Sequence, residues 1–315
     1  MNCKQRFMAA MRGEPVDRVP VTFYAHQPNA KAHIEWVQRT GMDGMAIEPE
    51  GYYGIAGHWD APLQTLDDLK KVRPFTKKDK YISGQVDRAR KVADAIGADH
   101  AILSMGFTPF SMIKHTLGGE TRIMELYRED PKAFCGVMDV FEETVFNLLD
   151  AMKESGTLDA FFVSFQNAEL WRFTPEEYTD LLMPYDKRLL AKCNENYDDV
   201  IVHLCSWGNE PNNIFLWQDY DYKVVNWGVY QEIDLSLAQG RKFFKPGTTV
   251  MGGFDRLEHG ILYTGTTEEI KEHTKQLIRE TGKDALILSA DCSVEPWLPD
   301  ASVRAVIEAC EEYED

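Results

Sequence analysis

Apolar residues occur along the chain in short runs that have the length and composition of buried β-strands. Several runs are apolar on both faces, which is typical of a parallel sheet covered by helices. The pattern predicts eight strands, at residues 19–25, 44–49, 100–105, 159–165, 199–205, 223–228, 249–254 and 285–291.

Amphipathic stretches separate these runs and predict helices. Thr174 and Thr266 stand before pairs of glutamates, and helix N-termini favour both a hydroxyl cap and acidic residues. Gly156 and Gly282 fall where helices should end. The helices are predicted at residues 30–40, 84–97, 131–156, 174–196, 266–282 and 300–314.

The alternation of strands and helices predicts a parallel α/β fold. Eight such units match a (β/α)₈ TIM barrel, with an N-terminal helical extension in residues 2–13 and further helices after the second and third strands. We find no linker of low complexity, so we predict one domain over residues 1–315. A doubly wound sheet is the alternative, although no G-x-G-x-x-G or G-x-x-x-x-G-K-[ST] motif follows an early strand.

The charge and the apolar patterning limit the classes of partner. Asp and Glu number 51 against 34 Lys and Arg, for a net charge of −17, so the chain repels nucleic acid and anionic membranes. No window approaches the roughly 18–20 apolar residues of a membrane helix, and the first 15 residues lack the apolar core of a signal peptide. We therefore expect a cytoplasmic protein with neither nucleic acid nor membrane as partner.

Three metal-binding side chains follow predicted strands. His203 and Cys205, in "VIVHLCSWG", are two positions apart, so they share one face of a strand, and Cys292 lies just past the last strand. The carboxyl ends of barrel strands meet at one mouth. One imidazole and two thiolates suit Zn²⁺ far better than Mg²⁺ or Ca²⁺, and three ligands leave a position for substrate. The alternative is packing, because buried cysteines usually pack and a two-residue pattern arises by chance.

The other cysteines carry no comparable signal. Six cysteines spread through a chain of this length favour reduced thiols or metal ligation over a disulfide framework. Cys135, Cys193 and Cys310 fall on the apolar stripes of predicted helices, so we expect them in the core.

Four polar or aromatic residues stand near the same mouth. Glu169 follows the strand at 159–165 and could be a fourth zinc ligand or could orient His203; the alternative is a solvated loop acid. Asn167 could bind substrate or cap the next helix. Tyr24 and His26 end the first strand and could line the pocket or simply pack.

Two aromatic loops flank these residues. The stretch "EGYYGIAGHW" at 50–59 suits a lid over an apolar ligand, and residues 205–222 would shape the substrate pocket. Each could equally be an ordinary aromatic loop.

Several segments together resemble the uroporphyrinogen decarboxylase superfamily over nearly the whole chain. They are "DRVPV" at 17–21, "GFTPFSMIKHTLGG" at 106–119, "FTPEEY" at 173–178 and "ADCSVEPWLPDASVRAVIEA" at 290–309. The H-x-C pair with a distant cysteine resembles its zinc-dependent corrinoid methyltransferase branch. That resemblance implies a TIM barrel, one Zn²⁺ and methyl transfer, with His203, Cys205 and Cys292 in the ligand positions.

The chain departs from the decarboxylase itself. That enzyme has an arginine-rich R-Q-A-G-R-Y segment soon after D-R-x-P-V to hold its polycarboxylate substrate, whereas this chain has "TFYAHQPNAKAH", without an arginine. The resemblance places Asp43 roughly where the decarboxylase carries its essential aspartate, and His115 near its active-site tyrosine.

The resemblance also implies a partner. No D-x-H-x-x-G motif surrounds any histidine, so a corrinoid would be carried by a separate protein that docks at the barrel mouth. The methyl group would pass between this corrinoid and a small-molecule methyl donor or thiol acceptor, in either direction. The alternatives are a metal-free uroporphyrinogen decarboxylase-type carboxy-lyase and a member that binds a corrinoid protein or a thiol without turnover.

Overall fold

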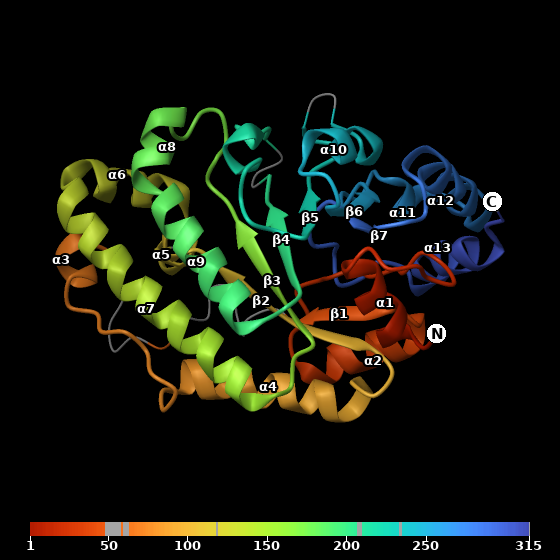
Figure 1. Cartoon of the computed structure of the whole chain (residues 1–315). Helices are drawn as coiled ribbons and strands as arrows, with labels where there is room; N and C mark the ends of the chain where they lie inside the picture. The colour runs from red at the N-terminus through yellow and green to blue at the C-terminus, as the bar shows by residue number, and fades with distance from the viewer. Residues whose placement is uncertain (48–57, 59–62, 118, 207–209, 233–234, 315) are drawn as a thin grey trace.

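A curled, parallel sheet of seven strands forms the centre of the molecule (Figure 1). The computed structural model describes residues 1–47, 58, 63–117, 119–206, 210–232 and 235–314. Neighbouring strands in the sheet are consecutive in the chain. They are β1 (Gly44–Ile47), β2 (Ala101–Phe107), β3 (Ala160–Phe165), β4 (Val200–Leu204), β5 (Val224–Trp227), β6 (Thr249–Phe254) and β7 (Leu286–Ala290).

Residues 19–25, predicted to be the first strand, do not form a regular strand, so that prediction is wrong. The segment makes only two isolated parallel bridges, Val21 with Leu288 and Ala25 with Val294. Pro20 has no N–H to donate to a ladder, which weakens regular pairing here. The segment still lies beside β7, where an eighth strand was expected, so the fold is a barrel-like α/β sheet with seven strands in the described part of the chain.

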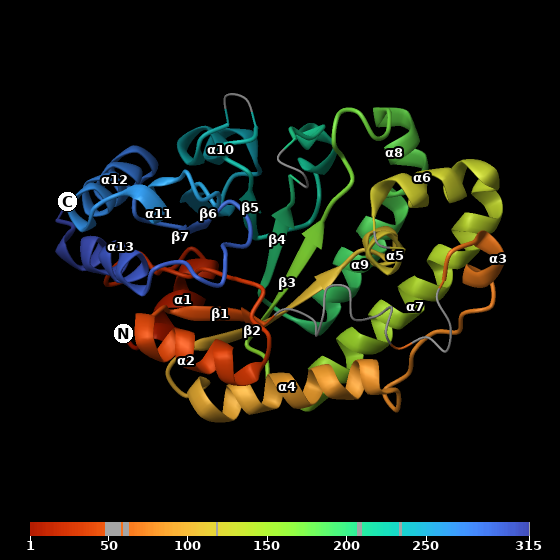
Figure 2. The same cartoon turned by 180° about the vertical axis from the view of Figure 1, so that it is seen from behind.

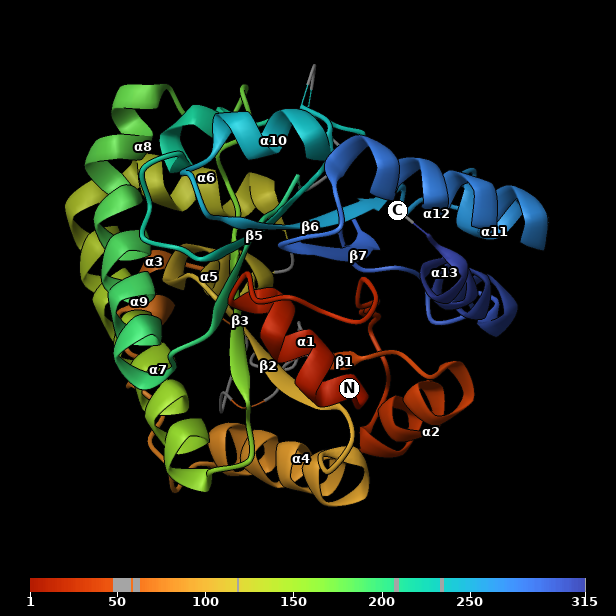
Figure 3. The ribbon, with the colours of Figure 1, turned by 45° about the vertical axis from the view of Figure 1, so that its right-hand side comes forward.

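Helices pack around the outside of this sheet (Figure 3), with α7 and α9 on one side and α12 and α13 on the other. The longer helices are α1 (Cys3–Met11), α2 (Ala30–Thr40), α4 (Lys80–Ile96), α5 (Pro109–Thr116), α6 (Glu120–Glu129), α7 (Pro131–Ser155), α9 (Met183–Asn196), α12 (Thr267–Thr281) and α13 (Asp300–Glu312). The shorter ones are α3 (Leu66–Leu69), α8 (Pro175–Leu181), η3 (Ile214–Trp217), α10 (Leu237–Phe243) and α11 (Ile261–Thr264).

The predicted N-terminal extension, α1, covers the amino ends of the strands. The Lys4 amide donates to the Asp99 carbonyl just before β2, and the hydroxyl of Thr249, the first residue of β6, donates to the Ala10 carbonyl. The Phe7 ring is fully buried against Gly44, the first residue of β1. The opposite end of the sheet, toward which the arrowheads of β2, β3 and β4 point in Figure 2, is left to the loops after the strands.

The helix ends follow the capping signals. The hydroxyls of Thr174 and Thr266 each accept a hydrogen bond from a backbone N–H three residues on and form capping boxes with glutamates. Gly156 ends α7 with a φ of 64°, which glycine adopts without steric strain. The predicted helix at 174–196 is two helices, α8 and α9, because Pro184 cannot donate an intrahelical hydrogen bond.

The three cysteines that were predicted on the apolar stripes of helices lie in the core or against it. Cys193 and Cys310 are buried, whereas Cys135 is half-buried and packs against the core. All six cysteines are free thiols.

Within the described residues, no helix is both long enough and apolar enough to span a membrane. The predicted lid at 50–59 lies outside the described residues, apart from His58.

Candidate metal centre

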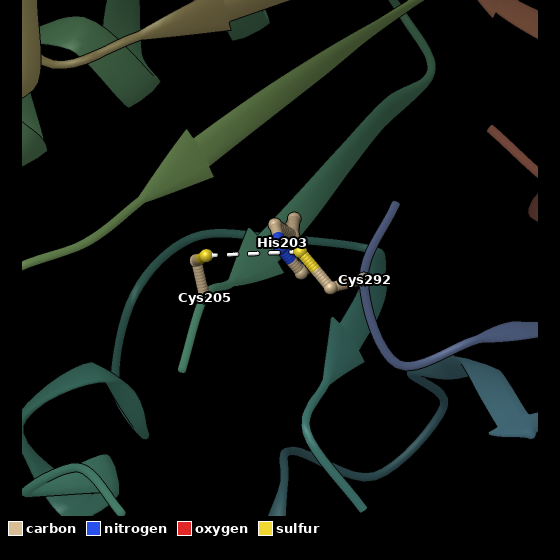
Figure 4. Close-up of side chains that lie close together, drawn as sticks. All are labelled: His203, Cys205 and Cys292. Atoms are coloured by element: carbon tan, nitrogen blue, oxygen red, sulfur yellow. Dashed lines mark hydrogen bonds between the residues drawn. The ribbon is translucent and has the colours of Figure 1, made fainter. Parts of the chain in front are cut away.

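Three potential metal ligands meet at the carboxyl ends of β4 and β7. His203 is in β4, Cys205 directly follows the last residue of β4, and Cys292 lies two residues after β7. The imidazole nitrogen and the two sulfurs all lie within 4.8 Å of one another. Figure 4 shows the thiols of Cys205 and Cys292 directed toward each other beside His203. The structure thus brings together the three side chains that the sequence selects.

The spacing of the sulfurs fits a shared metal ion. They are 3.9 Å apart, far beyond the roughly 2.05 Å of a disulfide bond. Two sulfurs that are each about 2.3 Å from a tetrahedral Zn²⁺ would be roughly 3.8 Å apart. One imidazole and two sulfurs are also a donor set typical of zinc. The residues present therefore fit Zn²⁺ in both chemistry and separation.

The two thiols are within hydrogen-bond distance of each other, and either could be the donor. This hydrogen bond and, second to it, burial raise the pKa of Cys205 well above its usual value. The same hydrogen bond lowers the pKa of Cys292 well below its usual value, and His203 adds to that decrease. Binding of a metal requires both sulfurs as thiolates, so it would release the protons that they carry.

A pocket of about 40 Å³ lies over these side chains. It includes Tyr24 and His26, which the sequence placed near the mouth. The Tyr24 hydroxyl is 3.5 Å from His203 Nε2, and His26 Nε2 is 3.2 Å from the Ser293 hydroxyl. The lining consists of Tyr24, His26, Met105, Phe107, Ser164, Gln166, His203, Cys205, Cys292 and Ser293.

Sequence reasoning missed half of this lining, including Ser164. Ser164 pairs in register with His203 and is 1% exposed. Its hydroxyl has no hydrogen-bond partner within the described part of the chain. The available signal was the alternation of Ser164 and Gln166, two polar residues on one face at the end of an apolar strand.

Glu169 is buried near the site but outside the cluster of potential ligands. The residue is fully buried, which rules out a solvated loop acid. Its Oε2 accepts a 2.8 Å hydrogen bond from Arg172 Nε, and its backbone bridges to Asn212. Among the described residues, the cluster of potential ligands contains only His203 and the two cysteines. The Glu169 carboxylate thus neutralises Arg172 and does not contact His203.

Asn226 takes the place beside His203 that was predicted for Glu169. It is a fully buried residue of β5, in register with His203 on β4. Asn226 Oδ1 lies 2.6 Å from His203 Nδ1. The sequence contains one indication of this contact, an amide in the middle of the otherwise apolar run "KVVNWG".

Asp43 lies at the other end of the sheet. It directly precedes β1, and its carboxylate accepts hydrogen bonds from Arg6 (2.6 Å), from Arg18 (2.8 Å) and from the backbone N–H of Val21 (2.8 Å). The structure therefore removes Asp43 from the substrate site, because the carboxylate is occupied in a buried ion-pair cluster.

His115 and Asn167 lie behind the pocket lining. His115 Nε2 is 3.3 Å from Gln166 Oε1, and burial lowers the pKa of His115 to about 2, so the imidazole is neutral. Asn167 has a φ of 76°, and its side chain accepts from Lys114 and donates to Ser111, both on α5. Neither residue is part of the described pocket lining, but His115 contacts two residues that are, Gln166 and Phe107.

The chain is similar to proteins of known class. A family model described as uroporphyrinogen decarboxylase (URO-D) matches residues 44–313. The chain is 19% identical to "Methylcobamide:CoM methyltransferase MtbA" of Methanosarcina mazei, over 98% of each. A solved methyltransferase from Methanosarcina mazei has the same fold, with a TM-score of 0.79 and 15% identity over 99% of both chains. A B12-independent methionine synthase from Shewanella sp. W3-18-1, solved in complex with selenomethionine, has a TM-score of 0.57 and 14% identity, over 90% of this chain and 85% of that chain.

Proposed function

The chain belongs to the uroporphyrinogen decarboxylase family, and we propose that within this family it is a zinc-dependent methyltransferase. The methyl group would move between a corrinoid carried by a separate protein and a small molecule, most simply a thiol acceptor. The relatives named methylcobamide:CoM methyltransferase support this assignment. The single observation that carries it is the approach of His203, Cys205 and Cys292 to within 4.8 Å beside a pocket.

His203, Cys205 and Cys292 would hold the metal. A neutral imidazole and two thiolates balance the charge of a divalent cation, and three protein ligands leave one position of a tetrahedral set for substrate. Zn²⁺ would supply Lewis acidity, which lowers the pKa of a substrate thiol so that it is nucleophilic at neutral pH.

The pocket residues would position the organic substrate. The Ser164 hydroxyl, buried and without a partner among the described residues, is available to a polar atom of the substrate. Met105 and Phe107 on β2 supply an apolar wall. About 40 Å³ accommodates roughly three water molecules. A space this small admits a sulfur and a methyl group but excludes a corrin ring, which must remain at the mouth on its own carrier protein.

The transfer then consists of one displacement. The acceptor sulfur forms a bond to the methyl carbon while the methyl–cobalt bond breaks in line. Both electrons of that bond stay on cobalt, which leaves as Co(I), and the thiol proton goes to solvent. The protein's contribution is to hold sulfur and methyl carbon in contact and to exclude water from between them.

The decarboxylase alternative has less support from the same residues. Asp43, the position that matches the decarboxylase's essential aspartate, is held by Arg6 and Arg18 at the far end of the sheet. Among the described pocket-lining residues there is no arginine or lysine to hold a polycarboxylate.

Metal analysis and a methyl-transfer assay test the proposal together. The purified protein is expected to hold one equivalent of zinc and to demethylate free methylcobalamin in the presence of a small thiol, seen as loss of the methyl–cobalt absorbance. Cys292→Ser should lose both properties. Cys135→Ser is the matched control, because Cys135 is a half-buried thiol on α7, remote from the pocket.

Two outcomes would overturn the proposal. One is zinc content in Cys292→Ser equal to that of the wild type. The other is decarboxylation of uroporphyrinogen by protein that has been stripped of metal with a chelator.

A further inference from the structure

Asn226 makes hydrogen bonds to three strands from one side chain. Its Oδ1 is 2.6 Å from His203 Nδ1 on β4. Its Nδ2 donates to the carbonyl of Met251 on β6 at 2.9 Å and to that of Ala290, the last residue of β7, at 3.2 Å. The side chain is fully buried, so these protein groups decide its orientation.

The two carbonyls fix which end of the amide faces His203. A carbonyl oxygen only accepts hydrogen bonds, so the NH₂ group must face Met251 and Ala290. A flipped amide would bring its oxygen against two carbonyl oxygens inside the core, where unpaired polar groups are costly. The Asn226 oxygen must therefore face His203.

The orientation of the amide determines the protonation of the imidazole. Because Asn226 Oδ1 accepts, His203 Nδ1 must carry the hydrogen. In a neutral imidazole the other nitrogen, Nε2, then keeps its lone pair. Nε2 is the atom near the Tyr24 hydroxyl, which lines the pocket. Only a nitrogen with a free lone pair can bind a metal ion.

We infer that Asn226 is a positioning residue that holds His203 as the Nδ1–H tautomer, with Nε2 directed to the metal. The same amide links β4 to β7, because Ala290 stands two residues before Cys292. Asn226 thus sets the position of the imidazole against the strand that carries the distant thiolate. The link to metal affinity rests on the proposed function, whereas the tautomer assignment does not.

The backbone of β6 supports this arrangement. Gly252, which lies beside Asn226 Nδ2, has a φ of 142°, a backbone conformation that residues other than glycine rarely adopt. A glycine therefore lets β6 take this conformation next to the amide. An aspartate in place of Asn226 could still accept from His203 Nδ1, but it has no hydrogen for the two carbonyls. The asparagine satisfies both requirements.

Nitrogen NMR of the metal-free protein, labelled with ¹⁵N-histidine, tests the assignment directly. The wild type is expected to show His203 as the Nδ1–H tautomer. Asn226→Asp should retain that tautomer while it lowers the stability of the protein. Asn226→Ala should shift His203 toward the Nε2–H tautomer that a free histidine side chain favours. Asn196→Ala, which removes another buried asparagine that bonds to Asp150, should leave the His203 signals unchanged.

Zinc affinity, measured by competition with a chelator, is the second readout. Asn226→Ala is expected to weaken zinc binding by about 10- to 100-fold, the usual effect of removing a partner of a histidine ligand. An Nε2–H tautomer in the wild type would overturn the inference, and so would unchanged His203 signals in Asn226→Ala. A wild type with the expected tautomer that binds no zinc would support the assignment of His203 and overturn the proposed function instead.

Discussion

Buried polar groups gather at both ends of the sheet, and the two groups differ in how far they satisfy one another. At the amino ends, the Asp43 carboxylate is saturated by Arg6, Arg18 and a backbone N–H. At the carboxyl ends, His203 and Cys292 face a pocket, and the Ser164 hydroxyl has no partner among the described residues. A closed network stabilises the fold, whereas an open one can bind a guest. We therefore expect mutations at the amino end to change stability and mutations at the carboxyl end to change binding.

The largest effect should come from the closed network. Asp43→Ala would remove the buried carboxylate shared by the buried Arg6 and the half-buried Arg18, and breaking such a pair typically lowers the free energy of unfolding by about 3–5 kcal/mol. Urea denaturation of the metal-free protein measures it. The exposed Asp87, paired with Arg90, provides the control, since Asp87→Ala should change stability by roughly 0–1 kcal/mol. The amount of zinc bound per folded molecule should not change. Loss of zinc binding in folded Asp43→Ala protein would contradict the division between an amino end that stabilises the fold and a carboxyl end that binds metal.

His203→Ala should have the next largest effect, on binding. Loss of a metal ligand should weaken zinc affinity by at least about 100-fold, or roughly 2.7 kcal/mol, with a smaller change in the stability of the metal-free protein than Asp43→Ala causes. His100→Ala is the matched control, because His100 lies before β2 at the amino end. Equal zinc affinities in the two variants would contradict the comparison.

Ser164→Ala should have a moderate effect that appears in substrate binding. Removing one hydrogen bond worth about 0.5–1.5 kcal/mol should raise KM for the thiol roughly 2- to 13-fold and leave kcat nearly unchanged. Ser289→Ala is a close control, because the Ser289 hydroxyl on β7 is also buried without a partner in the described residues but does not line the pocket. The expectation fails if both serine variants change KM alike.

The smallest effect concerns pH. Hydrogen bonds from Arg6 lower the pKa of Asp17 well below its usual value. A lowered folded-state pKa contributes stability above the unfolded pKa of about 3.9, and that stability is lost as the pH falls below it. Because Asp17 is an exposed residue, Asp17→Asn should lower the free energy of unfolding by only about 0.5–1 kcal/mol at pH 6. The difference between wild type and variant in the free energy of unfolding, measured by urea denaturation at several pH values, should shrink below pH 4. A difference that stays constant with pH would exclude this ion pair as its source.

Much of this organisation could be predicted from the sequence, because local patterns encode it. Strand and helix positions follow from apolar periodicity and from capping residues such as Thr266. The approach of Cys292 to His203 follows from the period of strands and the common direction of a parallel sheet. Neither inference requires knowledge of side-chain partners.

The errors at the site share a physical cause, which is that pairing between distant side chains leaves no local pattern. Asn226 could not be assigned because its role depends on the register of β4 against β5. The burial of Glu169 could not be predicted because it depends on the ion pair with Arg172. Asp43 resembles a catalytic aspartate in the sequence, but the two arginines that occupy it come from α1 and the segment after it.

The size of the pocket has a kinetic consequence. A carrier protein that docks over this pocket of about 40 Å³ would cover the space that the thiol occupies. For the proposed reaction we therefore expect the thiol to bind first and the carrier protein second. A carrier that arrives early forms a dead-end complex, so excess methylated carrier should inhibit turnover at low thiol and lose that effect as the thiol concentration rises.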